Sequence, residues 1–378
     1  MSNVVIAGYA RSPFHLANKG GLKKVRPDDL CAAVVKALVE RTKVNPDHIE
    51  DLLLGCAFPE GEQGMNVARQ IVFLAGLPIT VAGTTINRFC GSSMQSIHSA
   101  AGAIKMGAGD VFICAGIESM SRVPMGGYNP MPNPKLIDAG HKAYIGMGET
   151  AENLAQKYQI TREKQDAFAV ESQKRAAAAQ AAGKFNGEIV PIQTADGVVD
   201  SDGTIRGETT MEILAGLKPA FSEKGSVTAG TSSPLTDGAS AVLVCSEEYA
   251  AKNGLTPMAR IKSISVAGCA PEIMGIGPAP ATLKALARAG IKLDQIDVIE
   301  LNEAFAAQSL AVVQELGIDL AKTNIDGGAI AIGHPLGATG ARITGKAAQI
   351  MQREKKKYAL ATQCIGGGQG IATILEAL

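Results

Sequence analysis

Aromatic residues are scarce in this sequence and tryptophan is absent, so that Phe, Trp and Tyr together make up 4% of its 378 residues. Glycine is correspondingly common, with 43 residues, which favours tight turns and close packing of small side chains. A chain of this length can bury a large core in two or three domains, which excludes a small disulfide-stabilised scaffold. The composition is typical of an α/β enzyme rich in glycine and alanine.

The sequence also lacks an excess of charge of either sign, because 36 Lys and Arg residues balance 36 Asp and Glu residues. The longest run of like charge is the short cluster at 355–357, which argues against electrostatic binding to nucleic acid or to a membrane surface. No apolar run approaches the ~20 residues of a membrane-spanning helix, and the apolar segment 4–7 has no basic flank. We therefore expect an unexported, cytoplasmic protein without a membrane span.

Regular cysteine spacing is missing as well. The seven cysteines cannot all pair with one another, which suits a reducing compartment and leaves thiols free for chemistry. Neither Cys90 and Cys364 nor any pair of histidines has the spacing of metal ligands, so we expect no metal site. The segment 340–346 has the spacing of a phosphate-binding loop, but Ala347 follows it and offers no hydroxyl for Mg²⁺, which argues against nucleotide hydrolysis.

Short β-branched runs alternate with alanine-rich amphipathic stretches along the chain. The predicted strands lie at residues 4–7, 51–54, 111–115, 261–266, 297–301 and 358–363. The predicted helices lie at residues 27–42, 66–75, 280–289 and 304–316. This alternation favours a parallel sheet that is covered by helices.

The second half of the sequence repeats the order of the first. Residue 49 aligns with residue 296, and residue 111 with residue 358, at the same offset of 247 positions. Because the order and lengths of the elements also match, an internal duplication explains the pattern better than chance similarity between two ordinary αβ units. We expect an N-terminal half at 1–117, completed by about 236–257, and a C-terminal half at 258–378.

A segment of different character separates the halves at 118–235. It begins rich in proline, methionine and glycine, and then contains a helix that Thr161 caps, with Glu163 in its first turn and Gly183 after its end. Long structureless loops are uncommon and tend to be functional, so we expect an inserted loop domain that acts as a lid or binds substrate. A dimerisation arm without ligand contact is the alternative.

Cys90 stands in a polar turn directly before a helical pattern that includes Met94. Backbone N–H groups at a helix N-terminus lower a thiol pKa and can stabilise a developing oxyanion, so Cys90 is a candidate nucleophile. An inert core cysteine is the alternative, because free cysteine is among the most buried residue types.

His334 lies in a glycine- and proline-rich loop ahead of a predicted helix at 339–352. At the offset of the duplication, Cys90 aligns with Gly337, three residues from His334, so both halves present a reactive side chain at the same strand–loop–helix junction. Two such sites related by a pseudo-twofold axis would face each other. His334 is therefore a candidate base, although a lone histidine is more often a structural residue.

Two further candidates follow predicted strands, at the edge where α/β sheets place their ligands. Cys364 comes directly after the strand at 358–363 and precedes three glycines in the next four positions, whose N–H groups can converge on an anion. A plain tight turn would have the same sequence. Asn302 follows the strand at 297–301, where its carboxamide could polarise a carbonyl directly or through water.

Taken together and in this order, the stretches around Cys90, Asn302, His334 and Cys364 resemble the thiolase family over nearly the whole chain. The resemblance implies an α/β thiolase fold, in which two duplicated halves form a five-layer αβαβα sandwich with an inserted covering-loop domain. It also implies a homodimer or homotetramer, which could be a subunit of a multienzyme β-oxidation complex.

The resemblance implies a role for each of these residues. Cys90 resembles the acyl-accepting nucleophile, His334 its activating base, and Cys364 the acid and base at the substrate α-carbon. Asn302, acting through a water, and His334 would stabilise the thioester enolate. The backbone N–H groups of Cys90 and Gly366 would hold the oxyanion of the acyl-enzyme step.

A coenzyme A site is also implied by the resemblance. The stretch that begins at Met147 resembles the covering loop of the family, and the stretch that ends at Ser233 resembles its pantetheine-binding segment. Phe221 and Phe305 match positions that are expected to line that channel. Coenzyme A would then be a co-substrate, and no permanently bound cofactor is expected.

The chemistry of a thiolase fits these residue types. Cleavage of a 3-ketoacyl-CoA needs a soft nucleophile at the 3-keto carbon, a proton donor at the departing α-carbon, and donors to the thioester oxygen. Two thiols and an imidazole can exchange these roles if their pKa values lie near neutrality. We therefore expect a 3-ketoacyl-CoA thiolase, an acyltransferase of fatty-acid degradation that works reversibly through a Cys90 acyl-enzyme in a ping-pong cycle.

Three other functions are considered beside this one. A biosynthetic acetyl-CoA acetyltransferase would make acetoacetyl-CoA with the same residues, a decarboxylating ketoacyl synthase would carry His or Asn in place of Cys364, and a catalytically silent relative would have lost residues that are intact here. The Gly-Ser-Ser that follows Cys90 resembles the bacterial β-oxidation branch. Gly91 and Gly146 lack side-chain volume beside the nucleophile and the covering loop, which favours longer acyl groups unless these glycines only meet a backbone demand.

Overall fold

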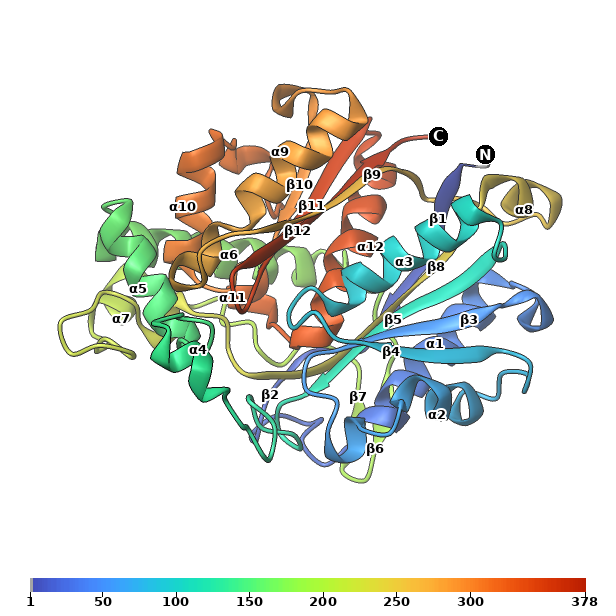
Figure 1. The fold of residues 1–378 in the computed structure, drawn as a ribbon, viewed down its shortest axis with the longest axis horizontal. Helices are drawn as coiled ribbons and strands as arrows, with labels where there is room; N and C mark the ends of the chain where they lie inside the picture. Colours follow the sequence, from blue (N-terminus) through green and yellow to red (C-terminus); the bar gives the residue numbers. More distant parts are fainter. Residues whose placement is uncertain (1–2) are drawn as a thin grey trace.

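The computed structural model describes residues 3–378, which form a layered α/β structure (Figure 1). Its strands are β1 (Val4–Arg11), β2 (His15–Leu16), β3 (Asp51–Cys56), β4 (Ala82–Ile86), β5 (Val111–Ser119), β6 (Ile192–Thr194), β7 (Gly197–Val199), β8 (Thr236–Ser246), β9 (Ala259–Gly268), β10 (Val298–Leu301), β11 (Tyr358–Ile365) and β12 (Gln369–Glu376). Its α-helices are α1 (Pro27–Thr42), α2 (Val67–Leu74), α3 (Ser92–Met106), α4 (Pro134–Asp138), α5 (Met147–Lys157), α6 (Arg162–Ala181), α7 (Met211–Ala215), α8 (Glu247–Lys252), α9 (Pro278–Ala289), α10 (Ala306–Leu316), α11 (Ala329–Ile332) and α12 (Leu336–Glu354). Within residues 3–378, no helix has the length and apolar character needed to cross a membrane.

The strands and helices predicted from the alternating pattern are all present, and the helix at 27–42 has the predicted bounds. Helix α1 begins with Pro27, whose fixed φ suits the first helical position, and two aspartates in its first turn face the positive end of the helix dipole. Several strands are longer than predicted, because β1 continues to Arg11 and β5 to Ser119 with every residue buried. Buried polar side chains at these strand ends interrupt the apolar pattern on which the prediction depends.

The sheet is mixed, and the expectation of a parallel sheet is wrong for several strands. Strands β3, β4 and β5 run parallel to one another, as do β10 and β11. The pairs that involve β1, β8, β9 or β12 are antiparallel. The connection from β11 to β12 is the turn 366–368, in which Gly367 and Gly368 have φ values of +80° and +86°. A connection this short can join only antiparallel strands, because a parallel pair needs a crossover of a dozen or more residues.

The strand order repeats, as the internal duplication predicts. Across the sheet the order is β10-β11-β12-β9-β1-β8-β5-β3-β4, so the elements read outward from β1 match those read outward from β9. The two halves meet at the centre, where Val5 pairs with Arg260 and Ile6 with Ala259. The duplication inferred from the sequence is therefore confirmed in the topology.

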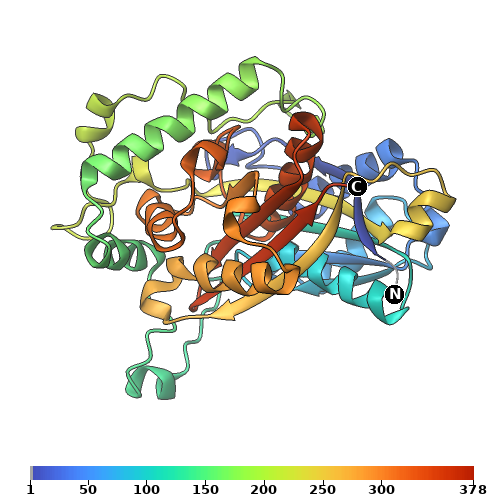
Figure 2. The same ribbon diagram turned by 90° about the horizontal axis from the view of Figure 1, so that it is seen from above.

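Helices cover both faces of this sheet and fill the space between its halves (Figure 1, Figure 2). Helices α1 and α2 pack on the outer face of the first half, where Leu38, Leu54 and Ile71 belong to one buried core. Helices α3 and α12 lie between the halves, and α9 and α10 cover the outer face of the second half. The layer order is αβαβα, as the resemblance to thiolases implies.

The segment 120–235 leaves the first half after β5 and returns as β8. Its longest helix, α6, begins after Thr161, whose hydroxyl accepts a hydrogen bond from the Lys164 N–H at 3.3 Å. The chain turns after this helix at Gly183, which has a φ of +68°, so both ends of α6 agree with the prediction. Helix α6 packs against α11 and the start of α12, whereas the arm that carries α4 projects away from the body (Figure 2).

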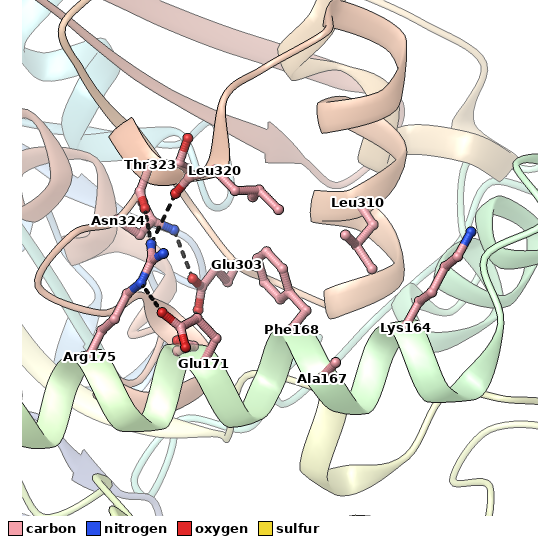
Figure 3. A pocket seen from close by; sticks show the side chains of 11 residues that line it. Lys164, Ala167, Phe168, Glu171, Arg175, Glu303, Leu310, Leu320, Thr323 and Asn324 are labelled. Atoms are coloured by element: carbon pink, nitrogen blue, oxygen red, sulfur yellow. Dashed lines mark hydrogen bonds and ion pairs between the residues drawn. The ribbon is translucent and has the colours of Figure 1, made fainter. Parts of the chain in front are cut away.

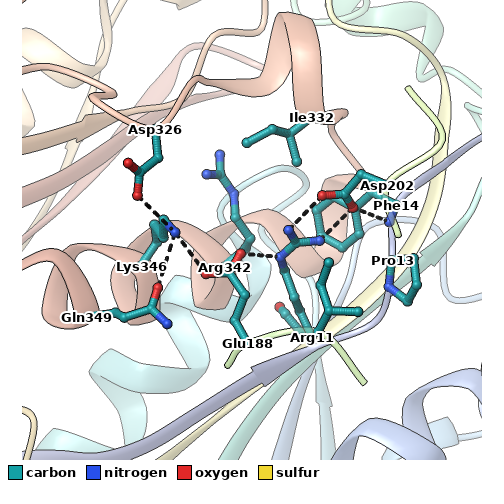
Figure 4. Close-up of polar contacts among 12 residues, drawn as sticks. Arg11, Pro13, Phe14, Glu188, Asp202, Asp326, Ile332, Arg342, Lys346 and Gln349 are labelled. Atoms are coloured by element: carbon teal, nitrogen blue, oxygen red, sulfur yellow. Dashed lines mark hydrogen bonds and ion pairs between the residues drawn. The ribbon is translucent and has the colours of Figure 1, made fainter. Parts of the chain in front are cut away.

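A buried network of charged side chains fastens the inserted segment to both halves (Figure 4). The guanidinium of Arg11 in β1 contacts Glu188 and Asp202 at 2.7 Å each. The ammonium of Lys346 in α12 contacts Glu188 at 3.0 Å and Asp326 at 3.1 Å. Buried charges are tolerated only when they are paired, so this network fixes the inserted segment relative to β1 and α12.

His98 gives the fold a measurable dependence on pH. Its Nε2 lies 2.8 Å from Thr373 Oγ1, and burial lowers the pKa of His98 to about 3. Below pH ~6.5 the unfolded chain takes up a proton at this side chain, whereas the folded chain leaves it neutral down to about pH 3. The contribution of His98 to stability therefore decreases as the pH falls through this window.

We expect the replacement His98→Asn to remove this dependence. Relative to the variant, the wild-type protein should lose about 1.4 kcal/mol of unfolding free energy per pH unit between about pH 6 and pH 4. Urea denaturation of both proteins across this range measures the difference. Parallel pH dependences would contradict a buried, neutral His98.

Candidate active site

One cavity of about 760 Å³ collects reactive side chains from both halves of the chain. Cys90 lies just before α3 in the first half, and His334 lies just before α12 in the second half. Cys364 enters the same cavity from the end of β11. The structure therefore brings together the two junctions that the duplication predicts to face each other, with Cys364 beside them.

The residues expected to contact coenzyme A line this cavity too. Met147, Phe221, Ser233 and Phe305 all form part of its wall. The rings of Phe221 and Phe305 meet edge to face with their centroids 5.8 Å apart. The N–H of Ser233 donates to the Ala304 carbonyl at 2.9 Å, which holds the segment before β8 against the start of α10.

A tight turn places Cys90 ahead of α3. Phe89 has a positive φ of 43°, Gly91 is the N-cap, and the helix begins at Ser92. Burial raises the pKa of the Cys90 thiol to about 12, and the hydrogen bond from the backbone N–H of Gly366 offsets only part of this effect. The expectation that the helix start lowers this thiol pKa is therefore wrong for the chain without substrate, because the loss of water outweighs the backbone N–H groups that stabilise the thiolate.

The hydrogen bonds of His334 define its tautomer. Thr339 Oγ1 donates to the Pro335 carbonyl at 3.0 Å and lies 2.6 Å from His334 Nδ1, so it accepts the proton on Nδ1. This assignment leaves Nε2 as the basic nitrogen, 3.3 Å from Nδ2 of Asn302. Burial, followed by the positive charge of Arg342, lowers the pKa of His334 to about 3. Burial therefore shifts both pKa values in the direction that disfavours the charged form, rather than toward neutrality.

Asn302 lies behind His334, outside the cavity wall, and is fully buried. Its Oδ1 has no hydrogen-bond partner among the described residues, so it is available to a bound water. The next residue, Glu303, accepts from Ser172 Oγ at 2.6 Å and from Asn324 Nδ2 at 2.8 Å. Glu303 also lines a smaller cavity of about 310 Å³ between α6 and α10 (Figure 3). These contacts fix the end of β10 and with it the Asn302 amide.

Cys364 is a protonated thiol close to Cys90. It lies within β11, which continues to Ile365 rather than ending at 363, and it pairs with Gly370 of β12. Burial, and the nearby Cys90, raise the pKa of the Cys364 thiol well above its usual value. A protonated thiol at this place can donate a proton to a carbon that departs from Cys90.

Sequence reasoning missed the apolar side chains that line the cavity beside the two thiols. Met120 and Leu336 pack with Cys90, whereas Met274 packs with Cys364. Met120 directly follows β5 at the carboxyl edge of the sheet, a position from which it could have been predicted. Met274 lies in an irregular helical segment that carries no such signal.

The thiol of Cys90 should react slowly with iodoacetamide at neutral pH. Only the thiolate reacts, so we expect its alkylation rate to rise about tenfold per pH unit from about pH 7 to pH 10 without a plateau. Peptide mass spectrometry measures alkylation at Cys90 and at Cys269 in the same sample. Cys269 serves as the internal comparison, because it is a partly exposed thiol outside the cavity wall, and burial raises its pKa to about 11. A plateau for Cys90 below pH 8 would show that the thiol is already ionised.

Comparison with known proteins agrees with this geometry. The family model for the thiolase N-terminal domain matches residues 4–248, and that for the thiolase C-terminal domain matches residues 255–377. The 3-ketoacyl-CoA thiolase of Bacillus subtilis is 47% identical over 389 residues, with 100% of each chain covered. The 3-ketoacyl-CoA thiolase of a Marinomonas strain is 50% identical, with 99% of this chain and 98% of that protein covered.

A solved structure supports the same conclusion. Human mitochondrial 3-ketoacyl-CoA thiolase in complex with CoA is 40% identical and superimposes with a TM-score of 0.92, with 100% of this chain and 98% of that chain covered. The resemblance and the α/β fold inferred from the four motifs are therefore confirmed. By its two matched domains, its layer order and its full-length relatives, the chain belongs to the thiolase family.

Proposed function

We propose that this thiolase cleaves 3-ketoacyl-CoA with coenzyme A to acetyl-CoA and a shortened acyl-CoA, as an acyltransferase of fatty-acid degradation. The observation that carries the proposal is the one cavity in which the thiols of Cys90 and Cys364 meet the imidazole of His334. Thiolysis needs a nucleophile, its base, and an acid for the departing carbon at one place. The full-length relatives named 3-ketoacyl-CoA thiolase support the degradative direction.

In the first half-reaction, Cys90 attacks the 3-keto carbon of the substrate. His334 Nε2 accepts the thiol proton as the sulfur–carbon bond forms, because neither group is ionised beforehand. The backbone N–H groups of Cys90 and Gly366 stabilise the resulting oxyanion. The bond between C2 and C3 then breaks and Cys364 protonates C2, so acetyl-CoA departs and the shortened acyl group stays on Cys90 as a thioester.

The departing acetyl unit carries enolate charge on its thioester oxygen while the carbon–carbon bond breaks. The protonated His334 imidazole donates to this oxygen. A water held by the free Oδ1 of Asn302 would donate its second proton to the same oxygen. Donors that are fixed before the reaction stabilise such developing charge at little cost in reorganisation.

In the second half-reaction, the thiolate of Cys364 takes the proton of the incoming coenzyme A thiol. The coenzyme A thiolate attacks the carbonyl carbon of the Cys90 thioester, and the sulfur of Cys90 leaves. His334 returns its proton to this sulfur. Both cysteines are then thiols again, so the cycle can start with the next substrate.

We propose that the inserted domain 118–235 is the cover over this site, between an N-terminal half of 1–117 with 236–257 and a C-terminal half of 258–378. Met147 and Phe221 come from this segment and line the cavity, which supports the role of a cover.

The coenzyme A phosphates would contact the same segment. Arg206 lines the cavity and is exposed, and within residues 3–378 it forms no salt bridge. A free guanidinium beside a substrate channel suits a phosphate group. The pantetheine arm would then run from Arg206 past Phe221 and Ser233 to the reactive thiols.

We expect an acyl-CoA to add one acyl group at Cys90. The variant Cys364→Ala should keep part of this acylation but lose about 10²–10⁴-fold in thiolysis and in α-proton exchange, which is the contribution of a positioned acid or base. Peptide mass spectrometry and exchange in deuterated water measure the two effects.

The control for this experiment is Cys245→Ala, which removes a buried thiol of β8 outside the cavity wall and should change neither reading. An adduct on Cys364, or normal proton exchange in Cys364→Ala, would reverse the roles that we assign to the two cysteines.

The two glycines expected to enlarge the acyl pocket differ in their surroundings. A Cβ on Gly91 would lie 2.6 Å from Ile365 Cδ1, so this glycine permits close core packing and gives no room to substrate. Gly146 lines the cavity, and a Cβ there would meet nothing nearer than 3.9 Å. Room for a longer acyl chain therefore depends on Gly146 and on Met120 and Leu336 near Cys90.

We expect kcat/KM to be higher for medium-chain 3-ketoacyl-CoA substrates than for acetoacetyl-CoA. Each methylene that the cavity buries contributes about 0.8 kcal/mol to the preference. Met120→Ala should shift the preference to longer chains, whereas Met106→Ala, at an exposed position on α3, should not. If kcat/KM instead peaks at acetoacetyl-CoA and vanishes at medium chains, the alternative function, biosynthetic acetyl-CoA acetyltransferase, replaces this one.

We also propose a cytoplasmic homodimer or homotetramer, open to association with other β-oxidation enzymes. Strand β4 is the edge of the first half, and the nearby side chains of Phe73, Leu74 and Ile79 are 54%, 49% and 76% exposed. A sheet edge with exposed apolar neighbours favours pairing with a second copy of the chain. The unpaired cysteines support a reducing compartment.

A further inference from the structure

Glu118 is a buried carboxylate at the end of β5 that lies behind the cavity without lining it. Its Oε2 accepts hydrogen bonds from the backbone N–H groups of Ala57 and Gly337, both at 2.9 Å. Its Oε1 accepts from Gln63 Nε2 at 2.8 Å and from the Phe58 N–H at 3.3 Å. The donors come from both halves, so one side chain joins the loop after β3 to the start of α12.

The contact with Gly337 supplies a cap that α12 otherwise lacks. The helix begins at Leu336 after Pro335, which offers no side-chain cap. The Glu118 carboxylate binds a free N–H group of the first turn and places negative charge at the positive end of the helix dipole. His334 lies two residues before the helix, so this contact fixes the backbone that carries the base.

The contact with Ala57 reaches the nucleophile through a short chain of hydrogen bonds. Asn87 Nδ2 donates to the Ala57 carbonyl at 3.0 Å, and the Phe89 N–H donates to Asn87 Oδ1 at 2.8 Å. Phe89 directly precedes Cys90 and has a φ of +43°, a conformation that a non-glycine residue keeps only when its surroundings impose it. The ring of Phe58 lies 6.0 Å from that of Phe89 and adds a second contact.

We propose that Glu118 is a positioning residue that sets the placement of the Cys90 sulfur relative to the His334 imidazole. The proposal rests on the roles that the proposed function gives to these two residues. Proton transfer between them depends steeply on geometry, and a misplacement of about 1 Å can lower a rate about 10²-fold. In addition to burial, the negative charge of Glu118 raises the pKa of Cys90, which provides a second measurement.

The test is Glu118→Gln, which keeps the shape of the side chain but replaces one acceptor oxygen with an NH₂ group that cannot accept a backbone hydrogen bond. We expect kcat for thiolysis to fall about 10- to 100-fold while KM for coenzyme A stays within about twofold. Single-turnover acylation of Cys90 should slow by the same factor, and its alkylation by iodoacetamide should move to lower pH. The control is Asp166→Asn, which neutralises a similarly buried carboxylate on α6 and should leave kcat unchanged.

The variant Glu118→Asp keeps the negative charge of the side chain but shortens it, and so tests the effect of side-chain length alone. A carboxylate that is one methylene shorter cannot contact both halves at once, so kcat should fall while the alkylation profile of Cys90 stays close to that of the wild type. Full kcat in Glu118→Asp, unchanged kcat in Glu118→Gln, or a loss confined to KM would each overturn the proposal.

A milder variant covers the case in which Glu118→Gln does not fold. Gln63→Met removes one side-chain donor to the same carboxylate, together with the bonds of Gln63 to the Ser119 N–H and the Phe58 carbonyl, and leaves the backbone donors to Glu118 in place, so a several-fold fall in kcat is expected. Wild-type kcat in this variant would overturn the proposal. A wild-type enzyme that forms no acyl adduct on Cys90 would overturn the proposed function instead, so the two failures are distinguishable.

Discussion

The active site depends on direct backbone contact at the starts of α3 and α12. A Cβ on Gly340 of α12 would lie 2.2 Å from the backbone nitrogen of Met94 in α3. A Cβ on Gly116 of β5 would lie 2.2 Å from the carbonyl oxygen of Gly337. No side chain larger than hydrogen fits at these distances. Because Cys90 and His334 lie at these two helix starts, the glycines allow the proposed nucleophile and its proposed base to share a cavity.

Packing this close also excludes water from Cys90 and His334, and the loss of water shifts the pKa values of both side chains. Burial raises the pKa of Cys90 to about 12 and lowers that of His334 to about 3, so the loss of water disfavours a thiolate–imidazolium pair before substrate binds. In the proposed mechanism, the proton therefore moves from Cys90 to His334 while the acyl carbon is attacked. The relative placement of donor and acceptor then matters more than the ionisation of either group, and Thr339 contributes by fixing the imidazole tautomer.

The sequence predicts those parts of the fold and of the candidate site that depend on local signals. Proline and threonine at helix starts locate α1 and α6, and the offset of 247 residues aligns the turn of Cys90 with the loop of His334. Such local signals do not predict contacts between segments that are distant in the sequence. In the sequence, Glu118 resembles an ordinary exposed polar residue at the end of a strand. In the structure it is buried, because its hydrogen-bond donors lie on other elements. Gly91 suggests room for an acyl chain, although Ile365 occupies that space.

The duplication explains how two related halves supply different parts of one site. In the first half, the connection from β5 to β8 holds the inserted segment 120–235, whereas the equivalent connection from β11 to β12 is the glycine turn 366–368. The long connection supplies the cavity wall around Met147 and Phe221. The short connection keeps Cys364 and the N–H of Gly366 against the nucleophile, where a long loop would leave no room for them. In the proposed mechanism, divergence at this one connection therefore separates substrate binding from the chemistry at carbon.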